Sequence, residues 1–343
     1  MQIGISLGYW RHGPREELYQ LVAEAERLGY ESIWTAEAYG SDALTPLAWL
    51  GSRTSRLQLG TAVMQMPART PTATAMAAMT MDQFSGGRFI LGLGVSGPQV
   101  AEGWYGQPFA RPLARTREYV GIVRATIARE REVEAPGPCY PLPLPGGTGL
   151  GKPLKSILHP LRTDLPLYLG AEGPRNMALT AEIADGLLTG NYPHRHDGMV
   201  RKALAEGFAR PGARRGPADF QVAAPVAVVI DDDVEQAAES LRPGLALTIG
   251  GMGAQAQNFH ANVFARAGWE AEVAAIQDHY AAGRYKDAAA AVTLPMIEEI
   301  ALIGSKAKVR DELTRWSESA VTSLLLRRPR LELAREFAEL AFG

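Results

Sequence analysis

A strand, a helix and a second strand follow one another in residues 57–94, which read LQLGTAVMQMPARTPTATAMAAMTMDQFSGGRFILGLG. Residues 57–63 form a short apolar run, and Thr70-Pro71 suits the start of an Ala- and Met-rich helix. The glycines at 86–87 suit the end of that helix, and a second apolar run follows at residues 88–93. Two short apolar strands separated by a helix predict a parallel β–α–β unit.

The same alternation continues on both sides of this unit. Six further strands are expected, with helical patterns between them, at residues 3–7, 32–35, 167–169, 186–189, 220–230 and 321–326. Eight strand–helix units predict an α/β fold, the (β/α)8 TIM barrel.

Two segments interrupt the alternation, the first after the fourth strand and the second after the seventh. A Pro- and Gly-rich segment lies at about 134–164, and an Ala-rich segment at about 243–305. We expect a single barrel domain over residues 1–343 with these two insertions. Both should carry local structure, because long structureless loops are uncommon in compact domains.

Composition excludes several classes of protein. One cysteine among 343 residues cannot form an internal disulfide, and a formal net charge of −2 gives no electrostatic basis for binding nucleic acid. The sequence contains no run of about 18 apolar residues that would predict a membrane span. The first residues also lack the basic flank and long apolar stretch of a signal peptide, so a cytoplasmic protein is expected.

Two glycine-rich motifs match nucleotide-binding patterns, but the residues around them are not those that such sites require. Residues 92–97 match the dinucleotide fingerprint, but Pro98 follows and the next strong helical pattern begins only near Arg111. Residues 146–152 match a P-loop, but Pro153 stands where a Ser or Thr should bind magnesium. Neither motif predicts a nucleotide site.

Few residues suggest metal or nucleophilic chemistry. His194 and His196 are two positions apart and would diverge on a helix, so we interpret them as part of a solvated helix start. Cys139 lies in the Pro-rich segment with no activating His or Asp at a suggestive spacing. We therefore expect neither a metal site nor a cysteine nucleophile.

The residues expected at the carboxyl ends of the strands, where TIM barrels place their sites, are mostly small or apolar. They lie at residues 7–10, 35–38, 62–65, 94–97, 170–173 and 189–191. Hydrolytic and metal-dependent barrels usually carry several ionisable groups there. This pattern instead favours a flat organic cofactor that lies against the backbone.

The turn at residues 170–176, GAEGPRN, predicts an anion site. A strand, a glycine turn and a helix start would place free backbone N–H groups at the positive end of the helix dipole, with Arg175 close by. The residues predicted to form this site are Glu172, Gly173, Pro174 and Arg175. The alternative is an ordinary turn in which Glu172 caps the helix.

Several stretches together resemble the bacterial luciferase-like superfamily. They are residues 59–63, 88–94, the loop at 149–155 and residues 181–187. Within that superfamily, residues 94–99 and 102–104 are most similar to the coenzyme F420-dependent oxidoreductases. The resemblance covers nearly the whole chain and is more specific for the superfamily than for F420 over FMN.

This resemblance implies a barrel whose third strand ends in a bulge containing a non-prolyl cis peptide, matched here to Ala62–Val63. The bulge would lie under the central ring of the deazaflavin and present its C5 carbon for hydride transfer. The resemblance also implies a phosphate site at Gly173, Pro174 and Arg175. Further ring contacts would come from the backbone of Gly94, Val95, Ser96 and Gly97 and from the end of the second strand near Glu37.

The chain departs from one branch of that family. Ala38 and Gly97 stand where F420-dependent glucose-6-phosphate dehydrogenases carry His and a catalytic Glu. A reaction on a sugar phosphate is therefore not expected.

Glu37 is the candidate catalytic acid, because it is the ionisable residue expected at the end of the second strand. Two alternatives are that Glu37 caps the following helix or pairs with an arginine. The leading hypothesis is an F420-dependent oxidoreductase that acts on a small organic substrate. An FMN-dependent monooxygenase and a non-catalytic flavin-binding protein are the alternatives.

A homodimer is the expected assembly. Flat Ala- and Met-rich helix faces can pack against a partner subunit or against their own barrel, and the residues concerned are Ala73, Ala75, Met76, Ala77, Ala78, Met79 and Met81.

Overall fold

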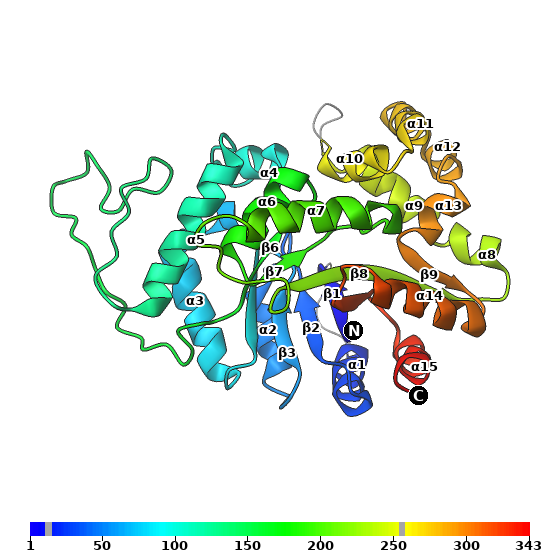
Figure 1. Ribbon diagram of the computed structural model, residues 1–343, viewed down its shortest axis with the longest axis horizontal. Helices are drawn as coiled ribbons and strands as arrows, with labels where there is room; N and C mark the ends of the chain where they lie inside the picture. The colour runs from blue at the N-terminus through cyan, green and yellow to red at the C-terminus, as the bar shows by residue number, and fades with distance from the viewer. Residues whose placement is uncertain (11–15, 254–257) are drawn as a thin grey trace.

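The computed structural model describes residues 1–10, 16–253 and 258–343. A parallel sheet at its centre closes on itself inside a layer of helices (Figure 1). The eight barrel strands, in hydrogen-bonded order, are β1 (Gln2–Gly8), β2 (Ser32–Thr35), β3 (Gln58–Thr61), β5 (Phe89–Gly94), β6 (Leu167–Gly170), β7 (Gly186–Leu188), β8 (Gln221–Ile230) and β10 (Ser323–Arg327). Strand β10 pairs with both β8 and β1 and so closes the circle. The predicted (β/α)8 barrel is confirmed.

Two short strands were not predicted from the sequence. Strand β4 (Met64–Gln65) resumes the line of β3 after a break and pairs with β5. Strand β9 (Ala301–Gly304) pairs with the second half of β8, beyond the part of β8 that lies in the barrel. Residues 64–65 were expected to follow the end of the third strand, and residues 301–304 to belong to the second insertion.

Helices surround the barrel in the order that the alternation predicts. Those packed around it are α1 (Glu16–Leu28), α2 (Leu44–Gly51), α3 (Pro71–Phe84), α4 (Pro98–Gly103), α5 (Pro112–Ala128), α6 (Pro174–Ile183), α7 (Asp197–Phe208), α14 (Lys306–Glu318) and α15 (Leu331–Phe342). A proline is the first residue of α3, α4, α5 and α6, where its fixed φ suits a helix start and its missing N–H loses no helical bond. None of the described helices is long and apolar enough to cross a membrane.

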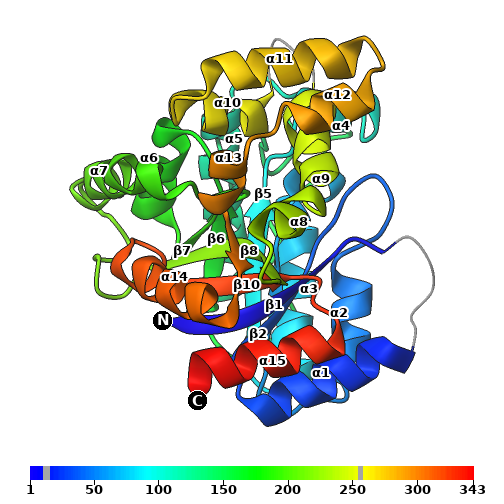
Figure 2. The same ribbon diagram turned by 90° about the vertical axis from the view of Figure 1, so that its right-hand side faces the viewer.

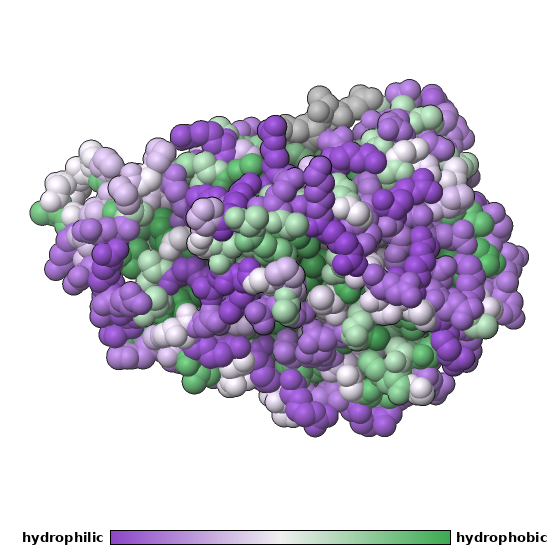
Figure 3. All heavy atoms as spheres, in the orientation of Figure 1, coloured by the Kyte–Doolittle hydropathy of each residue, from purple (hydrophilic) through white to green (hydrophobic). Residues whose placement is uncertain are grey.

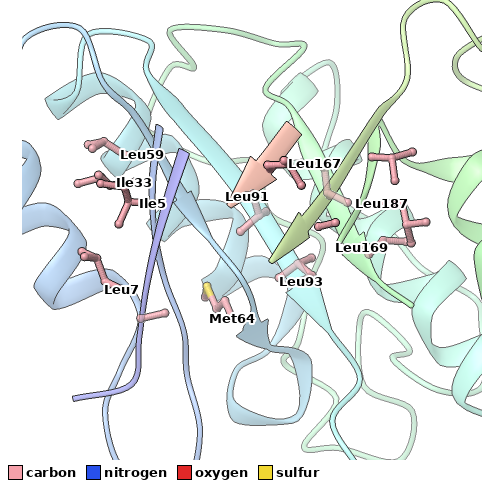
Figure 4. Packing of buried hydrophobic residues seen from close by; sticks show 14 of the residues in the cluster. Ile5, Leu7, Ile33, Leu59, Met64, Leu91, Leu93, Leu167, Leu169 and Leu187 are labelled. Carbon is pink, nitrogen blue, oxygen red and sulfur yellow. The ribbon is translucent and has the colours of Figure 1, made fainter. Parts of the chain in front are cut away.

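The strands separate two apolar layers by strict alternation of side chains. Residues such as Ile5, Ile33, Leu59 and Leu91 belong to the large core between the strands and the outer helices (Figure 4). Their neighbours fill the inside of the barrel, where the buried residues are Trp34, Ile90, Tyr168, Leu188, Ala223 and Leu325. The barrel is thus packed with side chains, and a ligand can lie only above this interior cluster.

Glycines make room for the two large rings inside the barrel. Trp34 and Tyr168 stack with their ring centroids 5.9 Å apart. A Cβ atom added at Gly60 would lie 2.1 Å from the Trp34 ring, and one added at Gly186 would lie 2.8 Å from the Tyr168 ring. Both glycines are therefore required by packing.

The second insertion forms a cap above the carboxyl ends of the strands (Figure 2). It begins directly after β8, earlier than the predicted position near 243. Its helices are α8 (Val234–Glu239), α9 (Arg242–Ala246), the short π-helix Leu247–Gly251, α10 (Phe259–Arg266), α11 (Glu270–Ala281), α12 (Tyr285–Ala290) and α13 (Leu294–Glu298). They enclose a separate apolar core that includes Ile249, Phe264, Ile276 and Met296. Residues 254–257 of this insertion lie outside the described part of the chain.

The first insertion, between α5 and β6, extends away from the barrel (Figure 1). Its local structure is limited to two antiparallel bridges, Val133 with Leu154 and Ala135 with Leu142. Hydrophilic residues dominate the face of the molecule seen in Figure 3, and apolar residues there form separate small patches.

Candidate active site

A bulge interrupts the third barrel strand at the edge where the carboxyl ends meet. The peptide bond between Ala62 and Val63 is cis, although Val63 is not a proline. The carbonyl of Thr35 accepts a hydrogen bond from the Ala62 N–H at 2.7 Å, and the Val63 carbonyl accepts one from the Glu37 N–H at 3.1 Å. The cis peptide that the resemblance implies at this position is confirmed.

Val63 lies between two glycines from neighbouring strands. A Cβ atom added at Gly94 would approach Val63 Cγ2 to 2.5 Å, and one added at Gly170 would approach Val63 Cγ1 to 3.2 Å. Ala62 and Val63 also pack on the interior cluster of the barrel. The bulge therefore forms an apolar floor over the packed interior, flanked by bare backbone.

The carboxylate of Glu37 is buried and fully engaged. It accepts a hydrogen bond from the Gln65 N–H at 2.7 Å and from Nη1 of Arg69 at 2.7 and 2.8 Å. Gln65 in turn donates its side-chain amide to the Glu37 carbonyl at 3.0 Å. Of the two structural alternatives for Glu37, the structure shows the pairing with an arginine, Arg69. It does not show helix capping, because the N-terminus of α2 has no side-chain cap. A catalytic role for Glu37 stays a prediction.

Asp42 completes this network on the far side of Arg69. Its carboxylate pairs with Nη2 of Arg69 and accepts the N–H of Thr45 at 2.6 Å. Burial alone would raise the pKa of Asp42, but the hydrogen bonds from Thr45 and the charge of Arg69 hold it below its ordinary value. Arg69 is consequently held by two carboxylates from one loop.

Three buried polar atoms at this edge have no hydrogen-bond partner within the described residues. They are Nε1 of Trp10, shortly after β1, Oε1 of Gln65, at the end of β4, and Oγ1 of Thr189, just after β7. Buried polar atoms in native proteins are nearly always satisfied, so each is an available contact for a bound group.

The loop after β5 brings Val95, Ser96 and Gly97 to the same edge as Gly94. Ser96 adopts a left-handed φ of 62°, and Gly97 is the N-cap of α4. The expectation that no helix follows these glycines until about Arg111 is wrong, because the short α4 begins directly at Pro98. Proline at the first helical position favours this start. The closed barrel itself excludes a dinucleotide-binding Rossmann fold.

The predicted anion site follows β6, the neighbour of β5. Gly173 is the N-cap of α6, and the side chain of Arg175 is exposed beside Pro174. Glu172 does not cap the helix; its Oε1 lies 2.9 Å from Nδ1 of His260, on the cap helix α10. Gly190 makes room for this pair, because a Cβ there would lie 2.0 Å from the Glu172 carboxylate.

His260 and Arg266 attach α10 to this turn. Arg266 donates a hydrogen bond to the Glu172 carbonyl at 2.8 Å. Burial alone would lower the pKa of His260, but its hydrogen bond to the Glu172 carboxylate raises it above 6.5. The cap is therefore held to the barrel by polar contacts at the end of β6.

Sequence reasoning missed the residues at the end of the last strand. Arg327 and Arg328 end and follow β10, beside Tyr9, which follows β1. The signal was present, since the eighth strand was predicted to end just before them and strand ends carry the site. His260 could not be found in the same way, because only the folded cap brings it to Glu172.

The interpretation of His194 and His196 as solvated is wrong. Both form a 3-10 turn before α7 that packs into the protein, and His196 is buried. The ring of His194 packs edge-on against Trp316 with centroids 4.4 Å apart. Among the residues that the structure describes, no three His, Cys, Asp or Glu side chains form a metal-binding group.

Comparison with known proteins shows the family of this chain. The profile of the luciferase-like monooxygenase family matches residues 2–323. A relative from Mycobacterium tuberculosis, provisionally named a coenzyme F420-dependent oxidoreductase, is 51% identical over 342 residues, which cover 99% of each chain. The chain belongs to the luciferase-like monooxygenase family, in the branch that contains F420-dependent oxidoreductases.

Solved structures show the same fold. The coenzyme F420-dependent tetrahydromethanopterin reductase of Methanopyrus kandleri superposes with a TM-score of 0.80 and 21% identity, covering 100% of this chain and 99% of its own. An F420-dependent secondary alcohol dehydrogenase, solved with an F420-acetone adduct, gives a TM-score of 0.75 and 17% identity, covering 99% and 97% of the two chains.

Proposed function

We propose that this protein is an F420-dependent oxidoreductase that transfers a hydride between the deazaflavin C5 and a small organic substrate. The observation that carries this proposal is the 51% identity, over 99% of both chains, to a relative named for that cofactor. When bound, the deazaflavin supplies or accepts the hydride, and the protein supplies binding and orientation.

Residues at the bulge fit a flat cofactor. Gly94 and Gly170, which have no side-chain carbon, leave room for the Val63 side chain in the floor of the site. Unsatisfied Oε1 of Gln65 and Oγ1 of Thr189 are available to polar atoms of a ring. A ring binding here would gain apolar contact with Ala62 and Val63 and satisfy buried polar atoms at the same time.

A second group of residues suits the phosphate of the cofactor. The backbone N–H groups of Gly173 and Arg175 lie at the start of α6, where the helix dipole favours an anion. The exposed guanidinium of Arg175 adds a full positive charge. The Glu172 carboxylate is bound to His260, so we propose that Glu172 contributes to this site through its position in the turn.

Glu37 is better placed to hold the bulge than to meet a substrate. Both of its carboxylate oxygens accept hydrogen bonds from Arg69. Its bonds to the backbone of Val63 and Gln65 hold both sides of the bulge. We infer that Glu37 positions the cofactor floor.

Aromatic residues at the same edge favour an organic substrate. Tyr39, in the loop after β2, and Trp104, at the end of α4, are both exposed and lie with ring centroids 6.5 Å apart. Phe109 and Phe259 meet in the same way between the loop before α5 and the cap, at 6.3 Å. Such rings bind apolar, planar molecules well.

Fluorescence titration of the purified protein with F420 and with FMN tests the cofactor. We expect micromolar or tighter binding of F420 and much weaker binding of FMN. The reverse order would favour an FMN-dependent monooxygenase. Tight F420 binding without turnover of any donor or acceptor would instead indicate a non-catalytic binding protein.

We also propose a cytoplasmic homodimer. On α3, Ala75, Ala78, Met79 and Met81 pack on the barrel, whereas Met76 and Phe84 are 57% and 85% exposed. These two apolar side chains are available to a second copy. Light scattering of the wild type and of Phe84→Lys tests this: a dimer that Phe84→Lys weakens is expected, and a monomeric wild type would contradict it.

A further inference from the structure

Two consecutive arginines, Arg327 and Arg328, stand at the carboxyl end of β10. Leu325 on that strand points into the barrel interior, and side chains two positions apart on a strand project to the same side. Arg327 therefore projects over the same interior cluster on which Val63 packs. Its guanidinium is at the proposed active site.

Neither arginine is neutralised. Neither forms an ion pair with a carboxylate in residues 1–10, 16–253 or 258–343, and residues 11–15 and 254–257 contain no Asp or Glu. The carboxylate that most affects Arg327 is that of Glu172, which is bonded to His260. This sector of the edge thus carries an excess of positive charge.

Arginines at the opposite end of the barrel behave differently. Asp185 alone accepts bonds from Arg124, Arg214 and Arg215, and Asp164 pairs with the last two. Carboxylates therefore neutralise these structural arginines. Arg327 and Arg328 have neutral partners instead, and they lie where a ligand is expected.

Neutral groups hold both guanidiniums in place. Nη2 of Arg327 donates to the Gly190 carbonyl and to Oδ1 of Asn191, the latter at 3.0 Å, both just after β7. The guanidinium of Arg328 lies 5.8 Å from the centre of the Tyr9 ring. Orientation by a carbonyl, an amide and an aromatic ring fixes the arginines without cancelling their charge.

We propose that Arg327 and Arg328 form a subsite for an anionic group, a carboxylate or a phosphate, of the substrate. This proposal deepens the proposed function and rests on it. If F420 lies on the floor formed by Val63, an anion bound by the two arginines belongs to the substrate above that floor. Guanidiniums recognise planar or tetrahedral oxyanions through paired N–H donors. The nearby Tyr9 carries a phenol O–H that can donate a hydrogen bond to the same anion.

The first experiment uses the protein without cofactor. Inorganic phosphate is titrated at constant ionic strength into the wild type, Arg327→Gln, Arg328→Gln, Arg175→Gln and the control Arg335→Gln, on α15. Calorimetry measures the affinity. We expect Arg327→Gln to weaken one phosphate site by roughly 10- to 100-fold, the loss typical of one charged hydrogen-bonding group, with the control unchanged. Phosphate binding that only Arg175→Gln weakens would overturn the proposal.

The second experiment distinguishes a substrate anion from the charged tail of F420. The affinities of wild type and Arg327→Gln are measured for F420 and for the same deazaflavin without its phosphate tail. Equal affinities of the two proteins for F420 support a substrate subsite. If Arg327→Gln binds F420 more weakly than the wild type but binds the tail-free deazaflavin equally well, the arginines bind the cofactor tail. That result would overturn the proposal.

Turnover then tests the substrate class. Unsaturated and carbonyl compounds are assayed as carboxylic acids and as their methyl esters. We expect the wild type to prefer the acids and Arg327→Gln to lose that preference by a rise in KM of about tenfold, with kcat little changed. A wild type that binds F420 and turns over esters as well as acids would contradict the subsite alone, whereas absence of F420 binding would contradict the proposed function.

Discussion

Glu37 and Arg69 form an ion pair at the edge of the barrel proposed as the active site, with both carboxylate oxygens within 2.8 Å of one guanidinium nitrogen. Glu37 follows β2, and Arg69 lies just beyond the short turn that follows β4. The ion pair therefore joins the loop after β2 to the segment after the bulge. The hydrogen bond from the Gln65 N–H to the Glu37 carboxylate holds the residues that follow the cis peptide. The floor of the site is held in place by this network.

Replacement of Glu37 by Gln should destabilise the protein and disturb the floor. Arg69 would lose one of its two carboxylates while remaining mostly buried, and Asp42 would still pair with it. We expect a loss of about 2 kcal/mol in the free energy of unfolding, measured in urea, together with weaker F420 binding.

Glu206→Gln is the control, because Glu206 is an exposed glutamate on α7, away from the bulge. Its stability and cofactor affinity should match the wild type. If Glu37→Gln binds F420 normally and loses only kcat, Glu37 is a catalytic residue and the positioning role is wrong.

Gly94→Ala should displace Val63. The new methyl group would lie 2.5 Å from Val63 Cγ2, so the bulge must move. We expect a loss of about 1–3 kcal/mol in unfolding free energy, the usual range for an overpacked site, and a measurable fall in F420 affinity. Gly103→Ala, which meets nothing within 4 Å, serves as the control.

The double variant Gly94→Ala with Val63→Ala identifies the cause. Removal of the Val63 methyl groups eliminates the closest contact, so part of the lost stability should return. A double variant whose defects are simply the sum of the two single ones would show that Gly94 matters for another reason.

Acid should destabilise the protein through His194. Burial lowers the pKa of His194 to about 4, so between its ordinary value of 6.5 and about 4 the unfolded chain binds a proton that the native state does not. Stability is therefore lost as pH falls through this window, by roughly 1.5 kcal/mol from near pH 7 to near pH 5 after allowance for solvent around the ring.

Urea unfolding at the two pH values measures this loss. His194→Phe keeps an aromatic ring against Trp316 and removes the titrating group, so its stability should fall less on acidification than that of the wild type. The exposed His159→Gln variant should behave like the wild type. Identical pH dependence in all three proteins would rule out a contribution from His194.

Glu26 should stabilise the approach to β3. Its carboxylate accepts backbone N–H bonds from Ser55, Arg56 and Leu57 at 2.9–3.1 Å. Burial would raise the pKa of Glu26, but these bonds lower it to about 2, so its stabilisation is present above about pH 4.5 and lost as pH falls toward 2.

Glu26→Gln should lower the unfolding free energy near neutral pH by about 1 kcal/mol, a modest value because solvent screens this site. The exposed Glu206→Gln variant on α7 should have no effect. Equal urea midpoints for Glu26→Gln and wild type would show that other contacts hold the loop.

Periodicity made the barrel predictable. Apolar runs such as residues 57–63 and 88–93 become β3 and β5 because their side chains alternate between two buried layers, which requires apolar residues at every position. The position of the cis peptide came from the resemblance alone, since Ala62–Val63 has no local signature.

Other features depend on contacts between distant residues. No local pattern joins Glu172 to His260, which are 88 positions apart, or Glu37 to Arg69, which are 32 apart. The helix α4 was missed because six residues carry too little periodicity to be recognised. Such pairings exist only once the strands have set the distances between loops.

The separate apolar core of the cap has an evolutionary consequence. Substitutions around Phe264, Ile276 or Met296 can reshape the roof without repacking the layer around Ile33 and Leu91, because the two clusters share no buried residue. Substitutions in the cap can therefore change which substrates are accepted while the barrel beneath it keeps its packing.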